Sequence, residues 1–395
     1  MKMRAVLAIL ATWMLAAHAH AHAHAERRCS RPAIVSAASS LHDARTALIA
    51  VPVGDMDTDV PPPARRAIER FKDRLQAYVE TSLACMPAAA SDAAILAALR
   101  AHGDRGERGP KTDGHGRDLD YAVLPVPNHA DWIAVVPSFG IRCGSDAIAL
   151  FYRRQGAHWR EAMVRRSAPY KEVNGGWENL HIDAPRAGPD GRWYIALTHG
   201  TPWCTSIWSG YHVELVRPTA DPLRPDIFLR RHLGYNRGFD TMVTADPRWF
   251  EVRLVDFSHD DNIWVRTSVQ RWAIEGDHTR RIQPVALNAQ DFVDEWIMTP
   301  WREASAWSAP GLAAWHRKLG FADAQKTEIN TWFDQIRACT GNRTEVALGS
   351  EDGEEYYLMV RRRGLAFRLL GLSRRHDLRC AGPNLKHDKP LLRGL

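Results

Sequence analysis

The stretch Pro189–Pro218, PDGRWYIALTHGTPWCTSIWSGYHVELVRP, decides the fold. Its apolar and β-branched residues predict two strands, Arg192–Thr198 and Tyr211–Arg217. A simple turn between them would need only Gly, Pro, Asn or Asp. The loop instead holds a histidine, two tryptophans and a cysteine: His199, Trp203, Trp208 and Cys204. The stretch therefore predicts a β-hairpin whose loop is a candidate functional site.

The same pattern of four short strands recurs on either side of this hairpin. The first segment has Leu119–Pro125, Trp132–Pro137, Ala147–Tyr152 and Trp159–Arg165. The second has Glu178–Asp183, the hairpin and Asp226–Arg231, and the third has Phe239–Thr244, Trp249–Phe257, Val269–Glu275 and Arg280–Leu287. A tryptophan stands at the start of each second strand, at positions 132, 193 and 249. The chain therefore contains a long repeat.

A repeat of four antiparallel strands is typical of a β-propeller blade. A fourth group of strands follows at Trp332–Ala338, Thr344–Leu348, Glu355–Arg361 and Leu365–Leu372. We predict a mainly β fold with helical insertions, arranged as a propeller or propeller-like ring of four to five four-stranded antiparallel sheets. A β-sandwich is the alternative, because it also contains many short antiparallel strands.

Six segments follow from this pattern. They are a signal peptide (1–25), an N-terminal helical segment packed on the β domain (26–116), three four-stranded repeats (117–287), a helical insertion (288–331), a closing four-stranded sheet (332–380) and a loose tail (381–395). Helical spacing of apolar residues predicts helices at Ala64–Cys85, Asp92–Ala101 and Gln290–Ile297. One candidate strand, Thr46–Val53, lies in the N-terminal segment.

The first 25 residues resemble an export leader. Lys2 and Arg4 precede the apolar run Ala5–Ala17, and an Ala-His alternation supplies cleavage sites. We expect an exported soluble protein, periplasmic or extracellular. We expect no membrane span, because this run is too short and no later one is longer.

The six cysteines all follow the leader, and an even count in an exported chain predicts disulfides. Cys143 and Cys204 each lie 11 residues after the tryptophan of their repeat, so they occupy equivalent loops. The predicted pairs are Cys29–Cys85, Cys143–Cys204 and Cys339–Cys380. No paired Cys/His spacing suits a structural zinc, so we expect no metal and no cofactor. The alternative is that cleavage after Ala19 exposes His20-Ala21-His22, whose amine, amides and imidazole could hold Cu(II).

Net charge is +6 for the chain and +4 without Lys2 and Arg4. No Lys/Arg block has the density of a nucleic-acid site, so we expect no nucleic-acid partner. Arg361–Arg363 and Arg374–Arg375 are interpreted as solvated strand ends.

The function that these features favour is binding on a tryptophan-rich face, because indole rings suit flat or amphipathic ligands. An envelope glycan or a protein is the expected partner. The ligand-binding candidates are Trp177, Trp203, Trp208, Trp264, Asn236 and Arg237. We expect one pocket, under the helical insertion, to be lined by His199, Trp203, Trp208, His259, Asp260 and Trp264.

A hydrolase is the alternative function, because a histidine beside carboxylates can act as a general base. Its candidate catalytic residues are His199, His259, Asp260 and Asp261. No nucleophile motif accompanies them, so the sequence leaves open whether the protein is an enzyme.

The leader interpretation gives the first testable prediction. N-terminal sequencing of exported protein should find a start between His20 and Glu26. An intact Met1 on exported material would contradict it.

Overall fold

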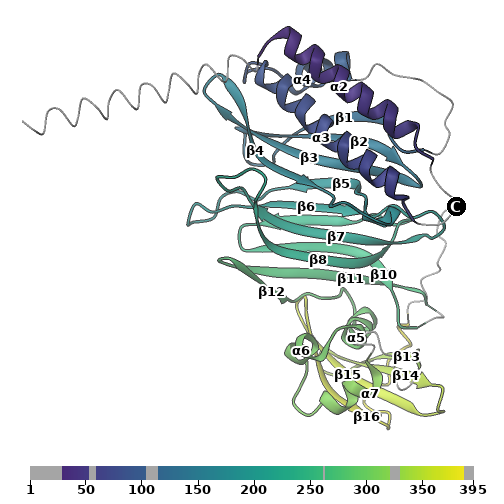
Figure 1. The fold of residues 1–395 in the computed structure, drawn as a ribbon. Coiled ribbons are helices and arrows are strands. Elements are labelled where there is room, and N and C mark those ends of the chain that lie inside the picture. The colour runs from purple at the N-terminus through teal and green to yellow at the C-terminus, as the bar shows by residue number, and fades with distance from the viewer. Residues whose placement is uncertain (1–28, 53–58, 104–113, 261–262, 321–329, 387–395) are drawn as a thin grey trace, which may run out of the picture. The chain divides into compact units, whose positions relative to one another are not determined.

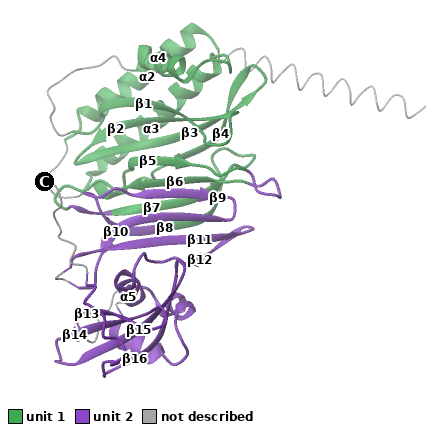
Figure 2. Cartoon of the chain, turned by 180° about the vertical axis from the view of Figure 1, so that it is seen from behind, with its two compact units in different colours: residues 1–186, 193–206, 210–231 green, residues 187–192, 207–209, 232–395 purple. Residues whose placement is uncertain are grey.

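The computed structural model describes residues 29–52, 59–103, 114–260, 263–320 and 330–386 (Figure 1). The predicted signal peptide and Asp261 lie outside them. The chain forms two compact units (Figure 2). Unit 1 comprises residues 1–186, 193–206 and 210–231, and unit 2 comprises residues 187–192, 207–209 and 232–395.

The described residues are mainly β, with four four-stranded antiparallel sheets whose strands follow chain order. The first sheet has β1 (Arg117–Pro125), β2 (Trp132–Ile141), β3 (Gly144–Gln155) and β4 (His158–Arg166). The second has β5 (Glu178–Asp183), β6 (Ile195–Gly200), β7 (Trp208–Arg217) and β8 (Asp226–Asn236). The third has β9 (Met242–Asp246), β10 (Trp249–Phe257), β11 (Val265–Glu275) and β12 (His278–Ile282). The fourth has β13 (Thr331–Cys339), β14 (Arg343–Ser350), β15 (Glu355–Arg363) and β16 (Ala366–Ser373).

Three helices precede the sheets: α2 (Arg31–Ile49), α3 (Pro62–Ala84) and α4 (Asp92–Gly103). The predicted strand Thr46–Val53 is wrong, because residues 46–49 form the last turn of α2. Ser30 caps this helix by accepting a hydrogen bond from the Ala33 N–H at 3.2 Å. Leu41 and Leu48 repeat at helical spacing on its buried face, in a sequence rich in alanine.

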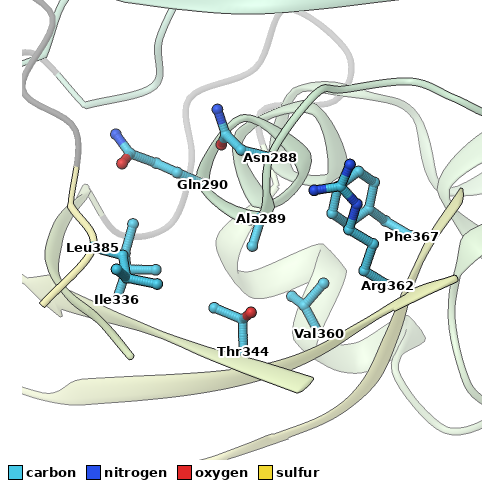
Figure 3. A pocket seen from close by; sticks show the side chains of 9 residues that line it. All are labelled: Asn288, Ala289, Gln290, Ile336, Thr344, Val360, Arg362, Phe367 and Leu385. Atoms are coloured by element: carbon cyan, nitrogen blue, oxygen red, sulfur yellow. The ribbon is translucent and has the colours of Figure 1, made fainter. Parts of the chain in front are cut away.

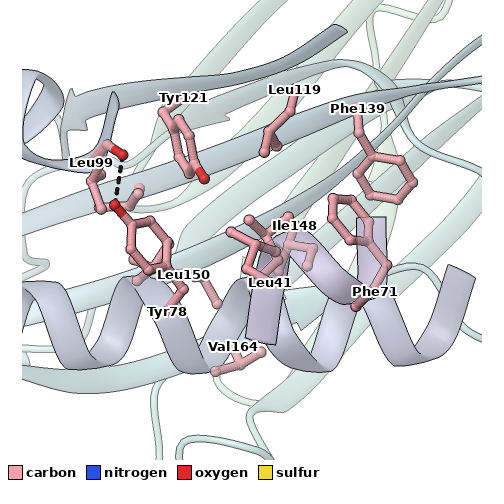
Figure 4. Packing of buried hydrophobic residues seen from close by; sticks show 14 of the residues in the cluster. Leu41, Phe71, Tyr78, Leu99, Leu119, Tyr121, Phe139, Ile148, Leu150 and Val164 are labelled. Carbon is pink, nitrogen blue, oxygen red and sulfur yellow. Dashed lines mark hydrogen bonds between the residues drawn. The ribbon is translucent and has the colours of Figure 1, made fainter. Parts of the chain in front are cut away.

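In unit 1, the first sheet is buried on both faces. Ile133 and Val135 of β2 pack in the cluster formed with α2, α3 and α4. Figure 4 shows part of this cluster, in which Phe139 of β2 packs against Phe71 of α3. Ala134 and Val136, which alternate with them, pack with Leu197 of β6. The first two sheets therefore share a core on one side, and the helices cover the other.

In unit 2, the predicted insertion contains α5 (Ala289–Met298), α6 (Trp301–Ala304), a 3-10 turn (Ser305–Trp307) and α7 (Ala313–Leu319). Residues 290–297 of α5 are all buried. Phe292 and Trp296 pack in the core of the closing sheet β13–β16, with Leu348 and Leu358. The opposite side of α5 carries carboxylates toward β11.

The three predicted disulfides are present: Cys29–Cys85, Cys143–Cys204 and Cys339–Cys380. Cys143 lies between β2 and β3, and Cys204 lies between β6 and β7. The predicted equivalence of these two loops is therefore confirmed. No helix in the described part of the chain is long and apolar enough to cross a membrane.

The disulfide between the two loops gives the second prediction. Replacing both Cys143 and Cys204 by serine should lower the free energy of unfolding by about 3–4 kcal/mol, because a 61-residue loop is released in the unfolded chain. Denaturant unfolding measures this difference. An unchanged midpoint would show that the cross-link does not restrain the unfolded state.

Candidate functional site

The loop between β10 and β11 carries His259, one of the candidate catalytic residues. Its imidazole Nδ1 lies 3.0 Å from Asp294 Oδ1, on the buried helix α5. The His259 N–H and the Ser258 hydroxyl also donate to the carboxylate of Asp294, at 2.9 and 2.5 Å. Burial would raise the pKa of Asp294, but His259 lowers it below its usual value. Three hydrogen bonds thus fix the loop to the helix.

The His259–Asp294 pair resembles the histidine and aspartate of a catalytic triad, but this histidine is not exposed. The His259 Nε2 has no hydrogen-bond partner among the described residues, and the side chain is fully buried. The Phe333 ring packs against the imidazole at 4.8 Å between centroids. The Ser258 hydroxyl donates to Asp294 and not to His259, so it is not activated as a nucleophile.

The next residue of α5, Glu295, anchors the helix to the third sheet. Its carboxylate pairs with Arg266 of β11 and Arg281 of β12, and it accepts from the Ser268 hydroxyl at 3.2 Å and the Thr299 hydroxyl at 3.0 Å. Burial would raise the pKa of Glu295, yet the two guanidiniums hold it at about 2. The carboxylate is therefore ionised throughout the physiological range.

Arg266 extends this network to the base of the loop. It donates to the Phe257 carbonyl at 2.7 Å and pairs with Asp256 at 3.1 Å. Burial raises the pKa of Asp256 to about 6, against the attraction of Arg266. The Phe257 end of β10 is thereby held by a buried ion pair.

Asp260 has a structural role in the β10–β11 loop. It is fully buried, and its carboxylate accepts a hydrogen bond from the Phe333 N–H at 2.8 Å. Its carbonyl accepts from the Ile263 and Trp264 N–H groups, both at 3.0 Å. These contacts close the loop and join it to β13.

Partly exposed apolar side chains lie at the end of β10, just before β11 and at the start of β7. Trp208 stacks on Phe257, with ring centroids 3.8 Å apart and planes at 24°. Phe257 opposes Val265 across the β10–β11 ladder, and Trp264 is one residue beyond that pair. Ile207, Phe257 and Trp264 are 45%, 40% and 51% exposed. We call Ile207, Trp208, Phe257 and Trp264 the aromatic surface.

Trp264 has left-handed backbone geometry, with φ of 67°. This conformation is unfavourable for a bulky residue, at a cost on the order of 1–3 kcal/mol. The Trp264 carbonyl accepts from the Ser258 N–H at 3.1 Å, which holds the strained geometry. Burial of the indole does not offset the cost, because half of the side chain is exposed.

The other predicted site residues are more enclosed. In unit 1, His199 is buried between Trp177 and His212, with ring centroids 4.5 and 4.8 Å away, and Trp203 is half-buried. In unit 2, the predicted ligand residues Asn236 and Arg237 are buried and half-buried. Asn236 accepts from the Gly238 N–H, and the Arg237 N–H donates to the Ile207 carbonyl at 2.8 Å.

A pocket that the sequence did not indicate lies between the start of α5 and the closing sheet (Figure 3). It is lined by Asn288, Ala289, Gln290, Ile336, Thr344, Val360, Arg362, Phe367 and Leu385. The residues come from segments up to about a hundred positions apart, so no local motif marks the pocket. Within the described residues, no three His, Cys, Asp or Glu side chains converge as metal ligands would.

Comparison with known proteins adds no family to this geometry. No family model matches the chain, and no curated protein matches it. The site must therefore be interpreted from its own residues.

The third prediction tests the anchor of the loop. Glu295→Gln should lower the free energy of unfolding by about 3 kcal/mol, because Arg266 and Arg281 would stay buried without that carboxylate. Glu303→Gln is the matched control. Its carboxylate is 30% exposed and 3.7 Å from Arg281, so the loss should stay below about 1 kcal/mol. Equal losses in denaturant unfolding would contradict the anchoring role.

Proposed function

We propose that this chain is an exported, non-enzymatic protein of the cell envelope that binds a glycan on the aromatic surface. One observation carries the proposal: Trp264 is held in a strained backbone conformation while half of its indole remains in solvent. Such strain is retained where the surrounding structure enforces it, and it gathers at ligand sites. The stacked Trp208–Phe257 pair supplies a second flat apolar face, as sugar rings require.

The leader and the disulfides support the location. Residues 1–25 have the pattern of a signal peptide, and all six cysteines are paired. Disulfides persist in oxidising compartments, which include the periplasm and the extracellular space.

The propeller-like ring is part of the same proposal. Every sheet is a four-stranded meander in chain order. The first two sheets also share one core, as consecutive blades would.

The hydrolase alternative has less support. Its two histidines are buried, and the Phe333 ring packs against the His259 imidazole. An enzyme of this kind would have to open the loop before His259 could reach a substrate. Its signature would be a His259→Ala variant that loses turnover while it retains ligand affinity.

The fourth prediction tests the aromatic surface. Trp208→Ala and Trp264→Ala should each weaken glycan binding by about 1–3 kcal/mol through lost contact area. His199→Ala should change it little. A screen against envelope glycans identifies the ligand, and calorimetry then measures affinity.

Trp332→Ala is the matched control, because Trp332 is 39% exposed in unit 2 but lies on β13, outside the aromatic surface. Equal weakening in Trp332→Ala, or no glycan bound by the wild-type protein, would overturn the proposed function. Binding of a protein in place of any glycan would identify the other partner class.

A further inference from the structure

An arginine row crosses the closing sheet of unit 2. Arg361 of β15 lies directly opposite Arg343 of β14 and Arg368 of β16. Side chains that oppose each other across neighbouring strands point to the same face of the sheet. Arg363 follows two residues after Arg361, so it shares that face at the end of β15. We call Arg343, Arg361, Arg363 and Arg368 the arginine surface.

Within the described residues, acidic side chains neutralise little of this charge. Arg361 and Arg363 form no ion pair with any described residue, and Arg368 donates only to the Ser308 carbonyl at 3.1 Å. Arg343 lies near Asp377, but that carboxylate forms its ion pair with Arg379 at 2.7 Å. The charge of the row is therefore available to a ligand.

The closest acid on the same face is also engaged. Glu345 is two residues from Arg343 on β14, and only 3% of its side chain is exposed. Its carboxylate lies 2.5 Å from His376 Nδ1 and accepts the Asp377 N–H at 2.9 Å. It makes no direct contact with the row.

The row has an electrostatic cost for the folded sheet. Like charges directly opposite each other in a sheet are destabilising, and three stand in line here. If these side chains served only to keep the sheet surface soluble, any polar residue would suffice at these positions. A ligand that brings negative charge would convert the repulsion into attraction.

The surface around the row is hollowed on both sides. One recess is lined by Gly341, Asn342, Arg343, Arg361, Arg362, Arg363 and Leu370. A second is lined by Gln283, Ala306, Trp307, Arg361, Arg363, Ala366, Phe367 and Arg368. Arg361 and Arg363 border both. Arg362, between them in sequence, turns to the pocket of Figure 3, where it lies over the Phe367 ring at 5.4 Å.

We propose that the arginine surface binds the phosphate or sulfate groups of an acidic glycan. The planar guanidinium matches these groups through paired hydrogen bonds. Two inter-strand spacings separate Arg343 from Arg368, roughly 10 Å, so the row can hold more than one anionic group along a polymer. The Asn342 amide in the first recess can bond sugar hydroxyls.

A nucleic acid fits this surface less well. Single strands bind through bases stacked on exposed rings. Phe367 and Trp307, the aromatic residues of the second recess, are both only 4% exposed. The recognised feature is therefore the anionic group and its sugar. The site uses none of the aromatic surface, so it stands or falls independently of the proposed glycan contact there.

The experiment compares two double variants of the full exported protein. Arg361→Gln with Arg363→Gln should weaken binding of dextran sulfate at least tenfold and reduce its dependence on salt. Arg302→Gln with Arg375→Gln removes the same charge from exposed positions of unit 2 that are outside the row, and it should change affinity less than twofold. The melting temperature of the first variant should not fall, because like-charge repulsion is relieved.

Further probes define the ligand class. Neutral dextran of equal length should not bind. Dextran sulfate and vesicles with phosphate headgroups distinguish a soluble from a lipid-borne source, and binding of either with loss in the Arg361/Arg363 variant supports the site. Equal losses in both double variants, or no anion binding by the wild-type protein, would overturn it. Tighter binding of single-stranded DNA than of dextran sulfate would overturn the acidic-glycan class.

Discussion

The ion pairs of Glu295 with Arg266 and Arg281 are the constraint on which unit 2 depends. Helix α5 is buried on every side, so its carboxylates can be accommodated only where guanidiniums meet them. The polar side of the helix is joined to the third sheet, while Phe292 on its apolar side packs in the closing sheet. The β10–β11 loop, the aromatic surface and the pocket beside α5 all take their geometry from this one helix.

In unit 1, a buried ion pair likewise joins a helix to a sheet. Lys72 of α3 is fully buried and pairs with Asp146 of β3 at 3.0 Å, and Ser167 bonds to both. Asp146 also accepts the Trp177 N–H at 3.0 Å. The backbone of Trp177, a predicted ligand residue, is thus hydrogen-bonded to the buried Lys72–Asp146 ion pair. Its ring stacks on His199 within the unit, which explains why this aromatic group is enclosed.

Much of the β architecture could be predicted from the sequence, because strand periodicity and the tryptophan spacing are local signals. The Cys143–Cys204 disulfide followed from the equal offsets of these two residues from the tryptophan of their repeats. Long-range electrostatics could not be predicted in this way. The adjacent acids Asp294 and Glu295 are typical of a solvated helix face, and only tertiary structure brings arginines to them. The alignment of Arg343 with Arg361 required the register of two strands. The predicted strand Thr46–Val53 is wrong because residues 46–49 form the last turn of an alanine-rich helix, although Thr46 and Ile49 also suit a strand.

Two sets of residues in unit 2, one buried and one exposed, differ in what stabilises them. The carboxylates of Asp294 and Glu295 and the His259 Nδ1 are buried and matched by protein partners, so folding alone explains their arrangement. Trp264 and the arginine row are exposed, and each carries a local cost: a left-handed backbone in one and repulsion between like charges in the other. The hydrogen bond from the Ser258 N–H to the Trp264 carbonyl holds the first conformation, and no acidic side chain among the described residues pairs with Arg361 or Arg363. A bound ligand would offset both, since sugar rings cover indoles and anionic groups neutralise guanidiniums. The exposed groups therefore favour binding, and the buried His259 serves the loop that positions Trp264.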